Sequence, residues 1–329
     1  MCLYLTVHLK NKVKPVKRAE ALDIAEATLK NSGFNVSRRC TSRTSCFDFA
    51  ARKEENLVFV KVLLDIKDVS PSDAAGLRTV AKCFDCTSLI ISDMKNNETL
   101  SDDTIYSRYN VYVVTSKTLD DIVRGTYPMI EATPGGYFVR LDGNEIRARR
   151  HELGLSIGKL AGMVGISRRA LYGYEMELTR ASVSVTYKMA EILGVPLVKT
   201  INILKNDLNN QKEDALPQHS KKVTRNKLHH LVIDKLAQLE FKVAHLRRAP
   251  FDFAARCPHT DLRIIGGFLK KKEQSVEERV EEIISLSEVV MAKSVFLGRE
   301  RTDKLKNVTF LGFDDLAKIS NRQELASLL

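Results

Sequence analysis

Hydrophobic residues recur along this chain in two patterns, one with the three-to-four-residue spacing of a helix and one as short runs of strand length. Near the N-terminus, four apolar residues have the helical spacing: Ala21, Leu22, Ala25 and Leu29. Apolar runs follow at 56–64 and 88–92, separated by a second helix-like stretch at 70–86. Helices that alternate with buried strands predict an α/β unit over residues 1–130.

The same order of elements returns near the C-terminus, around a six-residue sequence that occurs twice. FDFAAR occupies 47–52 and again 251–256, each time after a helix-like stretch and before an apolar run. Five elements match in order, which indicates a duplicated unit and predicts a second, shorter α/β copy over 227–329. The expected inward positions of its first helix are Leu228, Leu231, Val232, Leu236 and Leu239.

Between the two copies the pattern is helical throughout, and the predicted helices are short. Asp142 is expected to begin the first of them, with Leu153 on its buried side. Ser156 and Ser167 stand at the N-cap positions of the next two helices, and a glycine lies in the turn between those helices. Two short helices joined in this way form a helix-turn-helix unit, so we predict an all-α bundle over 137–204.

The charge of the chain, +11 in total, is concentrated in its middle. Residues 137–204 carry 10 Lys and Arg against 6 Asp and Glu, and residues 205–248 carry 10 against 5. Residues 1–136 carry 19 against 17, and residues 249–329 carry 13 of each. A polyanionic partner is therefore expected to contact the middle of the chain, although a solvated basic surface is the alternative. The composition of 205–226 is that of a polar linker.

The bulk composition indicates a globular protein away from membranes. Hydrophobic residues make up 44% of the chain and charged residues 28%. No apolar run reaches the length of a membrane span, and the N-terminus lacks the pattern of a cleavable signal. We therefore expect a cytoplasmic protein that contacts no membrane, and we expect no cofactor.

Four of the six cysteines raise the question of a metal site. Cys83 and Cys86 have the spacing of zinc ligands, and Cys40 and Cys46 could supply two more thiolates. However, Cys83 and Cys86 extend the apolar face of a predicted helix, and nothing like them occurs in the second copy. We therefore predict buried reduced thiols and no metal.

Residues 146–196 closely resemble the Cro and phage-repressor type of helix-turn-helix domain. The matching segments are RARRHELGLSIGKLAGMVGISRRALYGYE and AEILGVP. The chain departs from the family at one place, after the glutamate that ends the helix beginning at Ser167. In the family, a small residue and then a glycine usually follow this glutamate. Here Glu175 is followed by Met176, Glu177 and Leu178.

The resemblance implies that the helix from Ser167 to Glu175 enters the major groove of DNA, with its N-terminal residues at base edges. Arg168 and Arg169 are its first exposed residues, and an arginine there can bind guanine O6 and N7 together. The alternative for these two residues is a solvated basic face.

The resemblance also implies contacts with the DNA backbone and a dimer. The amides of Ser156 and Ile157 open a helix and suit a phosphate oxygen. Lys159 and Arg180 are further candidates for phosphate contacts, and Tyr172 could reach a thymine methyl or a phosphate. Modules of this type usually bind two half-sites as dimers, so we expect a homodimer and hypothesise that the flanking domains either dimerise or sense a partner.

The flanking copies are similar to the PD-(D/E)xK nuclease fold, in which two acids bind Mg²⁺ and a lysine steadies the attacking hydroxide. Asp48 matches the first acid and Lys61 the lysine, but Phe59 stands where the second acid belongs. In the second copy Asp252 is kept, whereas the lysine position falls near Gly266. These departures predict domains without catalytic activity.

Two interpretations of the flanking acids remain open. In a metal-dependent endonuclease, Glu20 or Glu26 on the first helix would replace the missing acid of the first copy. In an inactive scaffold, the aspartates of the repeated sequence hold a turn or pair with Arg52 and Arg256.

Most of the chain resembles a family of archaeal HTH-type transcriptional regulatory proteins. The resemblance rests on the FD-x-x-A-R strand, on TPGG at 133–136 and on S-R-R at the start of the recognition helix. We predict a homodimeric regulator that binds specific sequences of double-stranded DNA and is not an enzyme. The alternatives are a metal-dependent endonuclease and a protein-binding assembly module.

Overall fold

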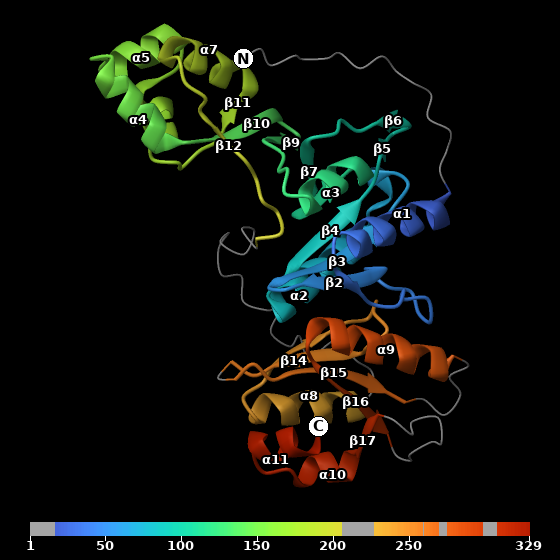
Figure 1. Cartoon of the computed structure of the whole chain (residues 1–329). Coiled ribbons are helices and arrows are strands. Elements are labelled where there is room, and N and C mark those ends of the chain that lie inside the picture. Colours follow the sequence, from blue (N-terminus) through green and yellow to red (C-terminus); the bar gives the residue numbers. More distant parts are fainter. Residues whose placement is uncertain (1–16, 206–226, 259, 270–274, 299–307) are drawn as a thin grey trace.

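The computed structural model describes residues 17–205, 227–258, 260–269, 275–298 and 308–329. Figure 1 shows an α/β unit in the middle, a helical module at one end and a second α/β unit at the other. Within these residues no helix is long and apolar enough to cross a membrane. The predicted linker lies outside the described residues except for Lys205.

The first α/β unit is a mixed sheet with helices on both faces. Its main elements are α1 (Arg18–Asn31), β1 (Asn35–Val36), β2 (Phe49–Lys53), β3 (Asn56–Val62), α2 (Pro71–Phe84), β4 (Thr87–Ile91), β7 (Thr104–Arg108), β8 (Val111–Val114) and α3 (Ser116–Val123). The strand order is β1-β2-β3-β4-β8-β7, with β3, β4 and β8 parallel to one another. A short hairpin of β5 (Met94–Lys95) and β6 (Glu98–Thr99) stands apart from this sheet.

Helices α1 and α3 cover one face of this sheet, and α2 packs on the other. Sequence periodicity predicted the buried side of α1 correctly: Ala21, Leu22, Ala25 and Leu29. Helix α2 begins at Ser70, whose hydroxyl accepts a hydrogen bond from the Asp73 amide, and it ends where Asp85 takes a positive φ of 53°.

The second α/β unit repeats the first, which confirms the predicted duplication. Its elements are α8 (Lys227–Gln238), β13 (Lys242–His245), β14 (Phe253–Arg256), β15 (Arg263–Phe268), α9 (Val276–Val290), β16 (Lys293–Gly298), β17 (Thr309–Gly312), α10 (Phe313–Lys318) and α11 (Arg322–Leu328). The order β13-β14-β15-β16-β17 reproduces β1-β2-β3-β4-β8, with the same parallel and antiparallel pairings.

The predicted buried side of α8 was only partly right. Val232, Leu236 and Leu239 are buried, but Leu231 is 62% exposed, and Ile233 is buried in its place. The side chain of Leu228 lies outside the described residues.

The two α/β units pack against each other through a shared core, called here the seam. Helix α2 of the first unit packs on β13 and β14, and α9 of the second unit packs on β2, so the contact has approximate twofold symmetry. Phe47 and Phe251, the first residues of the two FDFAAR sequences, lie near its centre with ring centroids 6.1 Å apart. The flanking copies therefore pair with each other within one chain.

The apolar residues of FDFAAR divide between the seam and the interior of their own unit. Phe47 and Ala50 contribute to the seam, as do their counterparts Phe251 and Ala254. Phe49 and Ala51 instead pack under the helices of the first unit. Phe253 and Ala255 do the same in the second unit. A strand buried on both faces explains why the sequence lacks the alternation of a surface strand.

The polar residues of FDFAAR complete this contact. Asp48 Oδ2 accepts a hydrogen bond from the Val62 amide at 2.7 Å, which fixes the end of β3. Arg52 donates to the carbonyls of Val289 and Val290 at 2.6 and 3.4 Å, where α9 of the other unit ends. The expectation that Arg52 pairs with the motif aspartate was therefore wrong, because its guanidinium instead satisfies carbonyls at a helix C-terminus.

Asp252 connects the two units by charge. Its carboxylate contacts Arg43 of the first unit at 2.9 Å and Arg279 of its own unit at 2.5 Å, and it accepts from the Phe268 amide at 2.6 Å. Burial alone would raise the pKa of Asp252, but the two guanidiniums outweigh it and hold the pKa below its ordinary value. The ionised form therefore stabilises the seam.

Replacing Asp252 by Asn should destabilise the protein by about 3 kcal/mol near neutral pH, because the buried Arg279 loses its counter-charge. The stabilising charge is fully present above the ordinary carboxyl pKa and is lost as pH falls through the lowered one. The difference in the free energy of unfolding between wild type and variant should therefore narrow below about pH 4. Urea denaturation at several pH values measures it, with the exposed Asp314→Asn as the control. A difference independent of pH would contradict the assignment.

Candidate nucleic-acid interface

The helical module contains the predicted helix-turn-helix. Helix α5 (Ile157–Val164) begins after Ser156, whose hydroxyl accepts from the Lys159 amide at 3.1 Å. Helix α6 (Arg168–Glu175) begins after Ser167, whose hydroxyl accepts from the Ala170 amide at 3.1 Å. Gly165 ends α5 with a φ of 84°, the left-handed conformation that favours glycine.

Two further helices, α4 (Gly143–Glu152) and α7 (Val183–Leu193), complete the bundle. Its core includes buried residues from all four helices: Ile146, Leu160, Ala161, Val164, Leu171, Met189 and Leu193. The predicted inward position of Leu153 was wrong. Leu153 is 43% exposed, because α4 has already ended and Leu153 is its C-cap.

The predicted DNA-binding side chains gather around the start of these two helices. Arg168, Arg169 and Lys159 are exposed, and Tyr172 is 51% exposed one turn along α6. The Arg168 guanidinium lies over Gly158 of α5, where a Cβ atom would come within 2.8 Å of its Nε. A glycine at this position therefore lets the arginine cross from α6 to the N-terminal turn of α5, next to the exposed Ser156.

A buried ion pair, which sequence analysis missed, joins α4 to α6. Arg150 contacts Glu175 through Nε at 2.6 Å and through Nη2 at 3.1 Å, with side-chain exposures of 6% and 3%. Arg150 also donates to the Leu155 carbonyl at 2.9 Å. This bidentate geometry fixes the C-terminal end of the recognition helix. The available signal was Glu175 itself, the only acid within an otherwise uncharged or basic α6 sequence.

Glu177 accounts for the departure from the helix-turn-helix family pattern. It takes a positive φ of 55° at the position where the family usually has glycine. Its carboxylate accepts from the Gly143 amide at 3.1 Å and pairs with Lys199 at 2.6 Å. These two contacts hold a conformation that would otherwise be costly for a residue with a side chain.

Arg180 lies in a different setting from the other predicted contacts. Its guanidinium pairs with Glu131, a buried carboxylate on the strand that precedes the helical module. The side chain is 37% exposed. Of the predicted DNA-binding residues, Arg180 thus forms an ion pair with the strand that connects the module to the first α/β unit.

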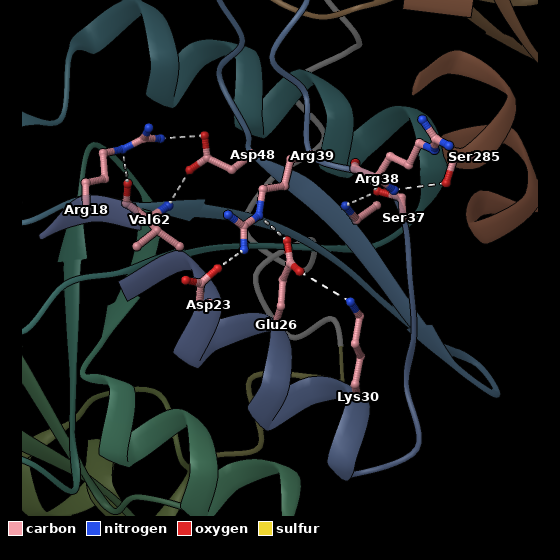
Figure 2. Close-up of polar contacts among 11 residues, drawn as sticks. Arg18, Asp23, Glu26, Lys30, Ser37, Arg38, Arg39, Asp48, Val62 and Ser285 are labelled. Carbon is pink, nitrogen blue, oxygen red and sulfur yellow. Dashed lines mark hydrogen bonds and ion pairs between the residues drawn. The ribbon is translucent and has the colours of Figure 1, made fainter. Parts of the chain in front are cut away.

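The residues of the nuclease-like site in the first unit are engaged by cations of the same chain. Asp48 pairs with Arg18 at 2.7 Å and with Lys61 at 3.2 Å, and Lys61 also donates to the Ser45 carbonyl at 2.9 Å. Figure 2 shows Arg18 bridging Asp48 and the carbonyl of Val62. The oxygens of Asp48 that would bind a metal therefore already have protein partners.

The two glutamates proposed to replace the missing acid do not join Asp48. Glu26 pairs with Arg39 at 2.5 Å and with Lys30 at 3.3 Å, as Figure 2 shows, while Glu20 is exposed. Among the described residues, no three His, Cys, Asp or Glu side chains come close enough together to hold a metal ion.

The second copy replaces the lysine by an arginine from a helix. Gly267 stands in the register position of Lys61, since the Phe268 amide binds Asp252 as the Val62 amide binds Asp48. A Cβ atom at Gly267 would lie 3.1 Å from Arg279 Nη2. The guanidinium of α9 thus occupies the space that a side chain on β15 would fill.

A polar pocket of about 390 Å³ opens at the seam, between α1, the chain after β1, and α9. Its charged groups already have partners across or within the units. Arg39 pairs with Glu26, and Glu282 accepts hydrogen bonds from the amides of Thr41 and Ser42, both at 2.7 Å. These contacts make the pocket wall part of the joint between the two copies.

The cysteines are buried thiols, as predicted for Cys83 and Cys86. Five free cysteines are buried in the described part of the chain: Cys40, Cys46, Cys83, Cys86 and Cys257. Burial raises the pKa of the Cys46 and Cys83 thiols to about 12. Both thiols are therefore protonated at neutral pH and serve as small apolar groups.

Comparisons with known proteins agree with this geometry. Residues 18–128 match the family model described as a PD-(D/E)XK superfamily domain, and residues 146–199 match the model described as helix-turn-helix. The chain is thus a helix-turn-helix protein with a nuclease-like unit before the helical module.

Relatives match over nearly the whole length. A protein of Pyrococcus furiosus is 31% identical over 93% of this chain and 95% of its own, and one of Pyrococcus horikoshii is 31% identical over 95% and 98%. A third, from Methanocaldococcus jannaschii, is 32% identical over 85% and 87%. All three are named "Putative HTH-type transcriptional regulatory protein". The chain belongs to this archaeal family, as its sequence predicted.

A solved structure titled as a SinR protein/SinI protein complex also matches, at 19% identity over 29% of this chain and 95% of its own. Its TM-score is 0.16, which is too low to support an argument about the fold.

The buried pair of Arg150 and Glu175 can be tested by Glu175→Gln. We expect the amides of α5 and α6 to lose about 3 kcal/mol of protection, because an unpaired guanidinium is left in the core of the module. Amide hydrogen exchange followed by mass spectrometry measures this change. Glu152→Gln is the matched control, since Glu152 pairs with Arg149 at an exposed position. Equal protection in the two variants would show that the buried pair contributes nothing.

Proposed function

We propose that this protein regulates transcription by binding specific sequences of double-stranded DNA, with the helix from Ser167 to Glu175 in the major groove. The observation that carries the proposal is the exposed first turn of α6, where Arg168 and Arg169 project from a helix whose other side is packed. An arginine at such a position can donate two hydrogen bonds to guanine.

Contacts with the DNA backbone are proposed around the same turn. The N-terminal amides of α5, at Ser156 and Ile157, suit a phosphate oxygen, and Lys159 projects from the same turn. Tyr172 is proposed to contact a thymine methyl or a phosphate. For Arg180, the predicted phosphate contact competes with the ion pair that its guanidinium forms with Glu131.

We propose that a homodimer binds two half-sites. The two flanking domains of one chain already pack against each other, so this contact joins parts of one chain and not two chains. A second chain must then use another surface. We further propose that the protein works in the cytoplasm, where its DNA is, and that it is organised as flanking units 1–130 and 227–329, a DNA-binding unit 137–204 and a linker 205–226.

We propose binding without cleavage. This is supported by Asp48 being paired with Arg18 and Lys61 and by the names of the relatives. A metal-dependent endonuclease is the second candidate, because residues 18–128 match the nuclease-like family and Lys61 lies 3.2 Å from Asp48.

Selection from a random duplex library tests the proposal. In EDTA, the wild type should enrich a palindromic site, and Arg168→Ala/Arg169→Ala should bind that site at least about tenfold more weakly, because each bidentate contact contributes about 1–3 kcal/mol. The control Lys117→Ala/Arg124→Ala removes two exposed cations, one on α3 and one at its C-cap, and should keep the site.

The other outcomes would contradict the proposal or favour one of its alternatives. A site bound equally by wild type and by the recognition-helix variant would contradict the assignment of α6. DNA shortened in Mg²⁺ by the wild type, but not by Asp48→Ala or Lys61→Ala, would establish an endonuclease. Neither enrichment nor cleavage would leave a protein-binding module.

A further inference from the structure

The sheet of the first α/β unit continues into the helical module. Strand β9 (Ile130–Thr133) pairs with β7 on one side and with β10 (Gly136–Leu141) on the other. Strand β10 then pairs with two short strands of the module, β11 (Ala181–Ser182) and β12 (Val198–Lys199). Figure 1 shows these strands at the junction between the middle unit and the helices. The module is therefore hydrogen-bonded to the unit and not merely tethered to it.

Glu131 is buried at the centre of this junction. In the sheet register it lies between Ile105 of β7 and Phe138 of β10, and Phe138 lies opposite Ser182 of β11. The side chain of Glu131 is only 6% exposed. A carboxylate at such a position is costly unless it is paired.

Two arginines from the module side pair with Glu131, one on each carboxylate oxygen. Arg140 of β10 reaches Oε1 at 2.9 Å through Nη2 and at 3.3 Å through Nε. Arg180, the residue before β11, reaches Oε2 through Nη1. The nearby carboxylate contributes to a raised pKa of Arg140, against the lowering effect of burial. One acid thus ties the strand that enters the module to the segment that leaves the recognition helix.

The segment between α6 and Arg180 is exposed and folds back on the recognition helix. The Leu178 amide donates to the Gly173 carbonyl at 2.8 Å. A Cβ atom at Gly173 would lie 2.9 Å from Thr179 Oγ1, so the glycine allows the segment to fold back on α6. Because this segment is short and hydrogen-bonded to α6, a displacement of Arg180 moves the end of α6.

The exit from the module is anchored separately. The Ile201 amide donates to the Pro128 carbonyl at 2.8 Å, and Thr87 Oγ1 donates to the Ile203 carbonyl at 2.9 Å. Ile201 and Ile203 are buried in the core of the first unit. These anchors hold the module to the unit independently of Glu131, so loss of the Glu131 carboxylate should leave the two joined.

We infer that Glu131 is a positioning residue, which acts through Arg180 to fix the recognition helix relative to the first α/β unit. The effect of Glu131 on DNA binding rests on the proposed function. Its effect on the junction between the first unit and the module does not. Arg180 contributes to DNA binding by this contact, rather than by binding a phosphate directly.

A double-mutant cycle on the full chain tests this inference, with Glu131→Gln, Arg180→Ala and the combined variant. Affinity for the selected duplex is measured over a range of salt concentrations. We expect Arg180→Ala to weaken binding about tenfold, the effect of losing one charge-assisted contact, and Glu131→Gln to weaken it at least as much, because Arg140 loses its partner as well. The combined variant should be no weaker than Glu131→Gln. The dependence of affinity on salt should stay that of the wild type in Glu131→Gln and in Arg180→Ala.

Amide hydrogen exchange of the free protein provides the readout that needs no DNA. Residues 176–182 should exchange faster in Glu131→Gln, while α2 and β4 exchange as in the wild type. Glu98→Gln, an exposed change on β6, is the control for both measurements.

The outcomes separate the inference from the proposed function. Additive losses of affinity, or a salt slope that falls by about one in Arg180→Ala while Glu131→Gln binds normally, would identify a phosphate contact and overturn the inference. If the wild type selects no duplex, the proposed function fails and the exchange measurement alone decides. Unchanged exchange of 176–182 in Glu131→Gln then overturns the positioning role, and faster exchange supports it.

Discussion

The architecture depends on one constraint: each α/β copy buries a strand on both faces, and one of those faces needs the helix of the other copy. In FDFAAR, Phe47 and Ala50 point to the seam, as do Phe251 and Ala254. The small alanines allow α9 and α2 to approach closely, and the two phenylalanines fill the space between the units. A single copy would expose this apolar face to water, at a cost of about 25 cal/mol for each Å². The two copies of FDFAAR thus form the two sides of one interface.

The nuclease-like acids are paired with cations of the same chain in both copies. Asp48 and Asp252 each accept a hydrogen bond from the amide that ends a strand, and each face two cations, but the cations come from different places. In the first unit they are Arg18 and Lys61, and in the second unit they are Arg279 and, across the seam, Arg43. A buried carboxylate needs compensating charge, and protein cations supply it in both copies. The scaffold keeps the aspartate of the nuclease pattern in both copies, and in the second copy arginines pair with it in place of the lysine.

Much of the local structure could be predicted because short-range chemistry determines it. Ser156 and Ser167 begin helices for the reason that the sequence suggests, and the duplication followed from the order of its elements. The incorrect and missed predictions have a different cause, which is long-range packing. Leu153 and Leu231 have apolar side chains at helical spacing, but their burial depends on where a helix ends and on what packs against it. The pair Arg150–Glu175 joins residues that are far apart in sequence, and neither residue type indicates its partner.

The seam also limits how this protein can match the symmetry of DNA. A dimeric reader places its twofold axis on that of a palindromic site. In this chain the approximate twofold axis relates the two flanking units, whereas the recognition helix between them occurs once. The axis within the chain therefore cannot relate two recognition helices, and the face that forms it is already buried. A twofold arrangement on DNA needs a second chain at another surface. The fixed junction at Glu131 then matters, because the spacing of two recognition helices would be set by how rigidly each is held to its flanking pair.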